Sequence, residues 1–374
     1  MASARRNLLL FVIFVAINGV TLRTVMAATG GYKTDAAIFI FGDSTADVGT
    51  NNHLKNCTAR ADHRYHGIDF PFSKPTGRYS NGKNAADQIA KLLGNYKISP
   101  PPFLSLLATH KSTFKRNLLR GANFASAGSG IFSATGQLSF HKVICLEEQI
   151  QQFATVRQAI TELLDSPKAV DDLLQNSIYI LSIGSNDLIE FELAGQPGGR
   201  DKFLAKLTET YAEHLADLYE LGARKFAIID IPPIGCCPAA RAYNATGGCM
   251  QDLNDNARSF YRSMQSNLAR FSLVFKGFKY SLGNTYAMTM NVIDNPRGNR
   301  FKEVKTACCG SGPFNGVTGC EVGANLCAKR SDFLFWDQFH PTETASELAA
   351  LTLVYGEGSE YVTPMNFSSL AMAA

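Results

Sequence analysis

Three side chains near opposite ends of the chain are of the types that nucleophilic catalysis requires. Ser44 follows an apolar run, residues 37–41, and lies in the turn Gly42-Asp43-Ser44, while Asp337 and His340 stand three positions apart near the C-terminus. A serine hydroxyl becomes a good nucleophile when a neighbouring imidazole takes its proton and a carboxylate orients that imidazole. Taken alone, Ser44 would be interpreted as a helix cap, since capping is the commoner role of serine. The serine, the acid and the base together favour nucleophilic catalysis at Ser44.

The elements that must position these side chains are apolar strands alternating with amphipathic helices. The pattern predicts strands over 37–41, about 120–123, 177–183, 225–231 and near 286–293, and helices over about 84–93, 146–164, 201–221, 251–275 and 343–354. The strands do not alternate apolar and polar residues, which is typical of a parallel sheet covered on both faces. With 45% hydrophobic residues, no repeat and no linker, the chain reads as one three-layer α/β domain.

Three turns with possible hydrogen-bond donors each follow a predicted strand. They are Gly42-Asp43-Ser44, Ala127-Gly128 and Gly184-Ser185-Asn186-Asp187. The carboxyl ends of parallel strands lie along one edge of the sheet, so these turns are expected to converge there. Asp337-x-x-His340 fits within one turn, which would let the carboxylate meet the imidazole. We expect Asp43 and Asp187 to brace their turns through backbone hydrogen bonds rather than to take part in catalysis.

The first residues have the layout of a secretory signal. Arg5-Arg6 form a basic start, residues 8–16 an apolar core, and Val25-Met26-Ala27 a small-residue cleavage site. The alternative is a membrane anchor, but the apolar run is about half of the ~20 residues that a spanning helix needs. We therefore expect residues 1–27 to be a cleaved signal peptide and residues 28–374 to be a single domain, secreted with no transmembrane segment.

The sequons and cysteines fit the same route. Asn56, Asn244 and Asn366 each begin an Asn-x-Ser/Thr sequon, the acceptor for N-glycosylation. All nine cysteines lie beyond residue 27, and in an oxidising compartment most of them should pair, with at least one left over. Spacing suggests a Cys236–Cys249 disulfide around a short loop. The pairing among the remaining cysteines stays open, including the four at positions 308, 309, 320 and 327.

Several function classes are disfavoured. A net charge of +4 is mild for 374 residues and gives no reason to expect nucleic acid as a partner. Gly77-x-x-x-x-Gly82-Lys83 resembles a phosphate-binding loop, but Asn84 stands where a Ser or Thr must hold magnesium. His63-x-x-His66 has the spacing of metal ligands without an evident third ligand, so we expect no metal and no organic cofactor. The chain also has no Gly-x-Ser-x-Gly elbow, which disfavours an α/β-hydrolase.

Seven motifs in order make the chain similar to a known family. They are FGDSTADVGTNN (41–52), GIDFP…PTGRYSNG (67–82), GANFASAGSG (121–130), IGSND (183–187), IPPIGC (231–236), ACCGSG (307–312) and FWDQFHPTE (335–343). In these the sequence resembles the GDSL esterase/lipase family of the SGNH hydrolase superfamily, and specifically its plant secreted branch. The resemblance covers nearly all of the chain after the signal. It implies a three-layer α/β/α sandwich with a mainly parallel, flavodoxin-like sheet.

The resemblance also implies a role for each matching residue. Ser44 would be the nucleophile, His340 the general base and acid, and Asp337 the group that orients His340. The oxyanion hole would consist of the Ser44 backbone N–H, Gly128 and Asn186. Two positions depart from the family pattern: Thr45 replaces the Leu of the family name, and Ala127 stands where many relatives have a second Gly. The second departure leaves open which of two neighbouring residues provides the donor.

The expected function is therefore that of a secreted serine esterase or lipase, active in the extracellular space, cell wall or apoplast. Its substrate would be a carboxylic ester, either an acyl lipid or an acetylated cell-wall polymer. One alternative is an acyltransferase or polyester synthase that uses the same three residues with an alcohol in place of water. Another is a non-catalytic lipid- or glycan-binding protein. We expect specificity to depend on the loops at 51–65, 132–145 and 191–199.

Overall fold

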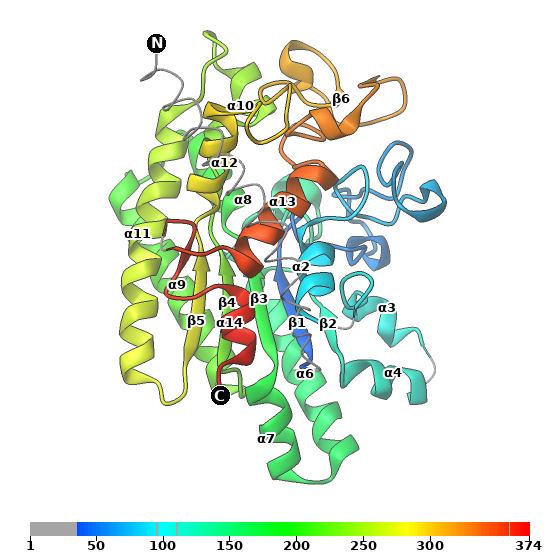
Figure 1. Cartoon of the computed structure of the whole chain (residues 1–374), viewed down its shortest axis with the longest axis vertical. Helices are drawn as coiled ribbons and strands as arrows, with labels where there is room; N and C mark the ends of the chain where they lie inside the picture. The colour runs from blue at the N-terminus through cyan, green and yellow to red at the C-terminus, as the bar shows by residue number, and fades with distance from the viewer. Residues whose placement is uncertain (1–35, 95, 110, 359) are drawn as a thin grey trace, which may run out of the picture.

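The computed structural model describes residues 36–94, 96–109, 111–358 and 360–374. The predicted signal peptide lies outside these residues. A six-stranded sheet in the order β2-β1-β3-β4-β5-β8 forms the centre of the molecule, and its first five strands are parallel (Figure 1). The order 2-1-3-4-5 is that of a flavodoxin-like sheet, as predicted. Only the edge strand β8 is antiparallel to its neighbour β5.

The strands are short and mostly buried. Their bounds are β1 Ile38–Gly42, β2 Gly121–Asn123, β3 Ile178–Ser182, β4 Lys225–Ile229, β5 Lys279–Gly283 and β8 Val362–Thr363, with β6 Cys309–Gly310 and β7 Asn325–Leu326 in a separate small sheet. All five residues of β1 are buried. Because side chains alternate between the faces of a strand, Phe39 and Phe41 pack into one core, whereas Ile38 and Ile40 pack into the other.

Helices cover both faces of the sheet, which confirms the predicted three-layer architecture. α2, α13 and α14 pack on one face, and α6, α9 and α11 on the other (Figure 1). The helices are α2 Ala85–Leu93, α3 Phe103–Leu107, α4 Lys111–Leu118, α5 Gln137–Phe140, α6 Leu146–Leu164, α7 Pro167–Asn176, α8 Ser185–Leu193, α9 Arg200–Glu220, α10 Pro238–Tyr243, α11 Gln251–Val274, α12 Thr285–Asp294, α13 Glu343–Tyr355 and α14 Phe367–Met372. The predicted helix over 146–164 has the bounds of α6.

One predicted element is wrong. The strand expected near 286–293 is the helix α12, and the neighbouring strand is β5, which ends at Gly283. The helix begins after Asn284, whose side chain accepts a hydrogen bond from the Ala287 backbone N–H at 3.0 Å. Met288 and Val292, four residues apart, point toward the interior, which is the spacing of a helix face. The run of apolar residues in this segment is compatible with both structures, and the asparagine cap decides for the helix.

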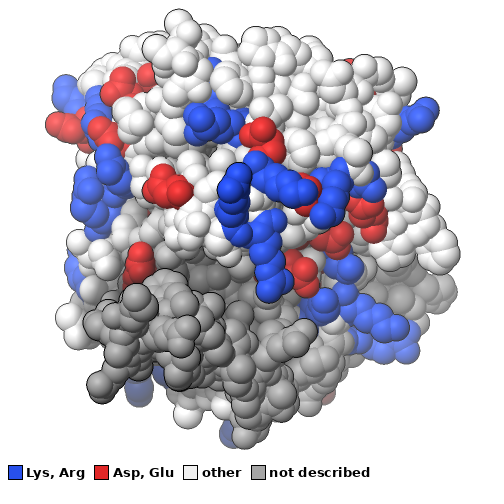
Figure 2. All heavy atoms as spheres, turned by 45° about the horizontal axis from the view of Figure 1, so that its top comes forward, with Lys and Arg blue, Asp and Glu red and all other residues white. Residues whose placement is uncertain are grey.

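Three disulfides close loops near the carboxyl edge of the sheet. Cys236–Cys249 is present as the spacing suggested, and the four cysteines of the later loop pair as Cys308–Cys327 and Cys309–Cys320. The remaining three cysteines, at positions 57, 145 and 237, are free thiols and buried. None of the helices in the described part of the chain is long and apolar enough to span a membrane. Charges of both signs are intermixed on the face in Figure 2.

Candidate active site

The structure brings Ser44, His340 and Asp337 into one line of hydrogen bonds. Ser44 Oγ lies 2.7 Å from His340 Nε2, and His340 Nδ1 lies 2.7 Å and 2.9 Å from the two oxygens of Asp337. Ser44 comes from the turn that ends β1, and the other two come from the segment before α13. The histidine and aspartate are buried, whereas Ser44 is partly exposed. In this arrangement the imidazole can take the proton of the hydroxyl, while the carboxylate orients the imidazole and stabilises its positive charge.

Asp337 is held in place by its own turn. One of its carboxyl oxygens accepts the backbone N–H groups of Phe339 at 3.0 Å and His340 at 2.9 Å. Burial raises the pKa of Asp337, but His340, His66 and the backbone N–H of Phe339 together outweigh burial, and the pKa lies below its usual value. The carboxyl group is therefore charged when it faces the imidazole. The ring of Tyr79 packs against the His340 ring, with 4.6 Å between their centroids, and so helps to hold the imidazole in place.

Three hydrogen-bond donors lie near Ser44. Among the described residues, the backbone N–H groups of Ser44 and Gly128 make no hydrogen bond. The Asn186 side-chain amide donates one hydrogen bond, 2.8 Å long, to the carbonyl of Ser129, which leaves its second N–H unused. Ser44, Gly128 and Asn186 all line the same cleft. This set of neutral donors is the type that stabilises an oxyanion.

The structure distinguishes between the two candidate donors at 127 and 128. The backbone N–H of Ala127 donates to the buried carboxyl of Asp47 at 2.9 Å, so it is engaged. Gly128 has a φ of +80°, a conformation that favours glycine, and an added Cβ would lie 2.5 Å from the ring of Phe140. Glycine is thus required at 128 by both backbone conformation and space, and its N–H is the one left unpaired.

Asp43 and Asp187 brace turns, as the sequence predicted. Asp43 accepts the backbone N–H of Thr45 at 2.9 Å and its hydroxyl at 2.8 Å. Asp187 reaches across to another turn, where it accepts the backbone N–H groups of Ile131 at 2.9 Å and Phe132 at 3.0 Å. Burial raises the pKa of Asp187 to about 6, although these hydrogen bonds lower it. The two carboxyl groups therefore fix the turn that carries Ser44 and the segment that follows Gly128.

Two supporting residues were not identified from the sequence. The amide of Gln149, in α6, accepts the backbone N–H of Gly42 at 2.8 Å and donates to its carbonyl at 2.9 Å. Gly42 lies so close to β3 that an added Cβ would be 2.4 Å from the carbonyl oxygen of Ser182. Gln149 and Asp47 are fully buried and position the turns on either side of Ser44. Gln149 reaches Gly42 and Asp47 reaches Ala127 across 107 and 80 positions of the sequence, so no local pattern could have indicated these two contacts.

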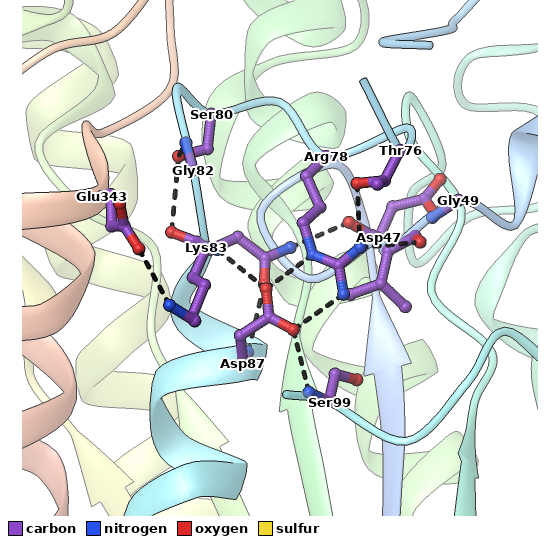
Figure 3. Close-up of polar contacts among 12 residues, drawn as sticks. Asp47, Gly49, Thr76, Arg78, Ser80, Gly82, Lys83, Asp87, Ser99 and Glu343 are labelled. Atoms are coloured by element: carbon purple, nitrogen blue, oxygen red, sulfur yellow. Dashed lines mark hydrogen bonds and ion pairs between the residues drawn. The ribbon is translucent and has the colours of Figure 1, made fainter. Parts of the chain in front are cut away.

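A buried ion pair holds the segment that follows the Ser44 turn (Figure 3). Arg78 donates from its Nε to Asp87 at 2.6 Å and from its Nη2 at 2.8 Å, and both side chains are almost fully buried. Arg78 also donates to the carbonyl of Val48 at 3.2 Å. Asp87 belongs to the capping box that begins α2, where Asn84 is the cap. Residues 77–83, which resembled a phosphate-binding loop, thus lead into α2 and supply Arg78, one partner of the ion pair.

Ser44 lies in a cleft of about 450 Å³ at the carboxyl edge of the sheet. The three loops that we expected to set specificity all contribute to it, for example through His63, Phe140 and Leu193. The segment 232–234 and the disulfide-closed loop at 319–321 also line the cleft, which was not predicted from the sequence. Apolar and polar side chains are mixed in the walls of the cleft, so it can accept a substrate that has both apolar and polar parts.

His63 and His66 both line this cleft. In the described part of the chain, no group of three or more His, Cys, Asp or Glu side chains is arranged so that it could hold a metal ion. The two rings meet edge to face at 4.9 Å. His66 Nδ1 accepts a hydrogen bond of 3.2 Å from the indole N–H of Trp336, the residue before Asp337. Burial lowers the pKa of His66 to about 4, so the ring is neutral at neutral pH. Through its hydrogen bond to Trp336, the His66 ring helps to hold the turn that carries Asp337.

Comparison with known proteins identifies the family. Residues 38–353 match the family model described as GDSL-like Lipase/Acylhydrolase. The chain is 36% identical over 340 residues to GDSL esterase/lipase LTL1 of Arabidopsis thaliana, covering 89% of this chain and 90% of that protein. It is 33% identical over 370 residues to GDSL esterase/lipase At4g28780 of the same organism, covering 97% of each. The chain therefore belongs to the GDSL esterase/lipase family and is a carboxylic ester hydrolase.

Proposed function

We propose that the protein is a secreted serine esterase in which Ser44 is the nucleophile, His340 the general base and acid, and Asp337 the group that orients His340. The observation that carries the proposal is the unbroken line from Ser44 Oγ through His340 to Asp337, with a shortest contact of 2.7 Å at each step. Because Asp337 binds Nδ1, the imidazole holds its proton there and presents an unprotonated Nε2 to the serine.

In the first half of the reaction, Ser44 Oγ attacks the ester carbonyl carbon while His340 Nε2 takes the hydroxyl proton. The carbonyl oxygen becomes an oxyanion, which accepts hydrogen bonds from the backbone N–H groups of Ser44 and Gly128 and from the Asn186 amide. When the carbon–oxygen bond to the leaving group breaks, His340 gives its proton to the departing alcohol. The acyl group is then an ester of Ser44.

In the second half, water enters and His340 takes one of its protons. The hydroxide adds to the acyl carbon, the bond to Ser44 breaks, and Ser44 regains a proton from His340 as the free acid leaves. An alcohol at this step would give a transesterification instead. The substrate we propose is a carboxylic ester of an acyl lipid or of an acetylated cell-wall polymer. The mixed apolar and polar walls of the cleft support that range.

The disulfides support secretion to the extracellular space, cell wall or apoplast. The structure has three disulfides. Disulfides are common in proteins of oxidising compartments and rare in cytosolic proteins. Of the three sequons, Asn56 is exposed, whereas the amide nitrogens of Asn244 and Asn366 donate hydrogen bonds to backbone carbonyls. We propose that Asn56 is glycosylated most readily, with a cleaved signal at 1–27 directing the chain to the secretory route.

The test compares wild type with Ser44→Ala, using p-nitrophenyl esters from acetate to palmitate and labelling by a fluorophosphonate. We expect only wild type to hydrolyse and to be labelled, with peptide mapping placing the label on Ser44. Equal hydrolysis and labelling by Ser44→Ala would exclude Ser44 as the nucleophile. Labelling of wild type without hydrolysis would favour the acyltransferase, which the addition of an acceptor alcohol to the assay would then reveal as a new ester.

A further inference from the structure

A second pocket of about 180 Å³ lies directly beside the cleft. It shares Thr45, Ser185, Pro232, Thr289 and Phe339 with the cleft, so the two spaces adjoin next to Ser44. Its other walls come from α12, α13 and the carboxyl end of β4, and they are mostly apolar. A cavity of about 150 Å³ holds a molecule the size of benzene, so this pocket has room for a short apolar group.

Two polar side chains in the walls of this pocket have no hydrogen-bond partner. Asp230 is the residue after β4, and neither of its carboxyl oxygens makes a hydrogen bond to a described residue. The hydroxyl of Ser346, in the first turns of α13, makes none either. The side chains are nevertheless buried, with 4% of Asp230 and 1% of Ser346 exposed. A buried polar group without a partner destabilises the fold. Two of them in one pocket indicate that a ligand completes their hydrogen bonds.

The environment of Asp230 determines what that ligand group must be. No Lys, Arg or His among the described residues is paired with its carboxyl. Burial raises the pKa of Asp230 well above its usual range, and the nearby backbone N–H of Ile231 offsets this only in part. Burial therefore favours the neutral acid form of this side chain, and a carboxylic acid both donates and accepts a hydrogen bond. The hydroxyl of Ser346 does the same, so the pair suits a hydroxyl group and not an anion.

We infer that this pocket receives the acyl part of the ester and that Asp230 and Ser346 recognise a hydroxyl group on that acyl chain. The inference rests on the proposed function. The acyl part is the half that stays bonded to Ser44 after the alcohol has left, so a pocket adjoining Thr45 can hold it throughout the reaction. The larger cleft then leaves a path for the alcohol to depart and for water to enter. Asp230 is a specificity residue in this arrangement, since it acts on the chain and not on the reacting carbonyl.

The test uses matched pairs of p-nitrophenyl esters, each with and without a hydroxyl at the end of a six-, eight- or ten-carbon acyl chain. The quantity compared is the ratio of kcat/KM for the hydroxylated ester to kcat/KM for the plain ester. At the preferred chain length, we expect Asp230→Leu to lower this ratio about 10-fold, because leucine is of similar size but makes no hydrogen bond. Asp230→Asn keeps a donor and an acceptor and is expected to stay within about threefold of wild type.

Ser346→Val is a second variant that tests the same ratio if the leucine variant does not fold, and we expect the same direction of change. The same ratio in wild type and both apolar variants, at all three chain lengths, would overturn the inference.

A binding measurement separates this result from a failure of the proposed function. In the Ser44→Ala background, calorimetry compares the free ω-hydroxy acid with the plain acid of the same length. Tighter binding of the hydroxy acid that is lost in Ser44→Ala/Asp230→Leu supports the inference even if wild type hydrolyses no ester. Equal binding of the two acids, or no binding of either, counts against it even if wild type is an active esterase.

Discussion

The carboxyl of Asp47 accepts the backbone N–H of Ala127 at 2.9 Å, and this hydrogen bond joins the turn after Ser44 to the turn that carries Gly128. The other carboxyl oxygen of Asp47 accepts the backbone N–H groups of Gly49 and Thr50, both at 2.7 Å. One buried side chain therefore sets the distance between the nucleophile and a candidate oxyanion donor that is 84 positions away in the sequence.

We predict that Asp47→Asn lowers kcat for p-nitrophenyl acetate about 10-fold. The substitution displaces an oxyanion donor without removing it, so it should cost less than the loss of a donor. The asparagine can still accept from Gly49 and Thr50, but its NH₂ group faces the N–H of Ala127 and cannot accept from it. KM should change less than kcat, because the turn affects the transition state more than substrate binding. Asp172→Asn, on an exposed helix surface, is the matched control. A folded Asp47→Asn protein with wild-type kcat would contradict the prediction.

Asn186→Ala should lower kcat about 10²–10³-fold with little change in KM, which is the usual effect of losing one oxyanion donor. The free N–H of the Asn186 amide is the donor lost, and its other N–H only anchors the side chain to Ser129. Steady-state kinetics on p-nitrophenyl acetate measure both constants. Asn176→Ala, an exposed asparagine on α7, controls for the substitution itself. A rate within twofold of wild type would show that Asn186 serves the turn and not the oxyanion.

Asp337→Asn should lower kcat by up to about 10⁴-fold while leaving the fold intact, because an amide no longer fixes the imidazole tautomer or stabilises its positive charge. The asparagine can keep the oxygen that accepts the backbone N–H groups of Phe339 and His340. The rate of fluorophosphonate labelling at Ser44 should fall in parallel, since labelling also needs an activated serine. Asp332→Asn, in a surface ion pair with Lys302, should label at the wild-type rate.

The sequence predicted the sheet well where strands are strongly apolar and end at Gly or Pro. β1, β3 and β4 lie within one or two residues of their predicted bounds, because each is a continuous apolar run buried on both faces. β5 reads KYSLG, with a lysine and a serine among its five residues, so its pattern is weak. The apolar residues of α12 that follow it were assigned to a strand for that reason.

In the candidate site, too, some residues could be predicted from the sequence and others could not. Ser44, Asp337 and His340 could be singled out because their types and motifs are distinctive, and the parallel sheet explained how Ser44 and Asn186 converge. Gln149 and Asp47 could not, because the hydrogen bonds by which they join separate turns run to Gly42 and Ala127, 107 and 80 positions away. The same holds for Asp230 and Ser346, since only tertiary structure shows that they share a pocket.

Asp87→Asn should destabilise the protein by about 3–5 kcal/mol in urea unfolding, because it leaves the buried guanidinium of Arg78 without a counter-charge. Asp87 also accepts the backbone N–H groups of Asn84 and Ser99, so α2 and the segment after it should loosen together. The double variant Arg78→Met/Asp87→Leu should recover part of this loss by removing both charges. The surface variant Asp172→Asn should change stability by less than about 1 kcal/mol. A similarly small loss in Asp87→Asn would show that the ion pair does little for stability.

His66 should make the protein less stable in acid. Its pKa in the folded protein is about 4, while the ordinary value is 6.5, so the unfolded chain binds more protons between these pH values. The free energy of unfolding therefore falls as the pH falls from about 6.5 to about 4, by up to about 3 kcal/mol from this one group. Asp47 and Asp187, whose pKa values are raised to about 6, act in the opposite direction over an overlapping range.

The contribution of His66 is isolated by comparison with His66→Gln, whose side-chain oxygen can still accept the indole N–H of Trp336. Urea unfolding at pH 7, 6, 5 and 4 gives the free energy of unfolding of both proteins. The advantage of wild type over His66→Gln should shrink as the pH falls, because only wild type must keep a proton off a buried ring that faces His63, His340, Asp62 and Asp337. The exposed His53→Gln should follow wild type at every pH. Parallel curves for wild type and His66→Gln would mean that the folded protein accommodates the protonated His66 ring without loss of stability.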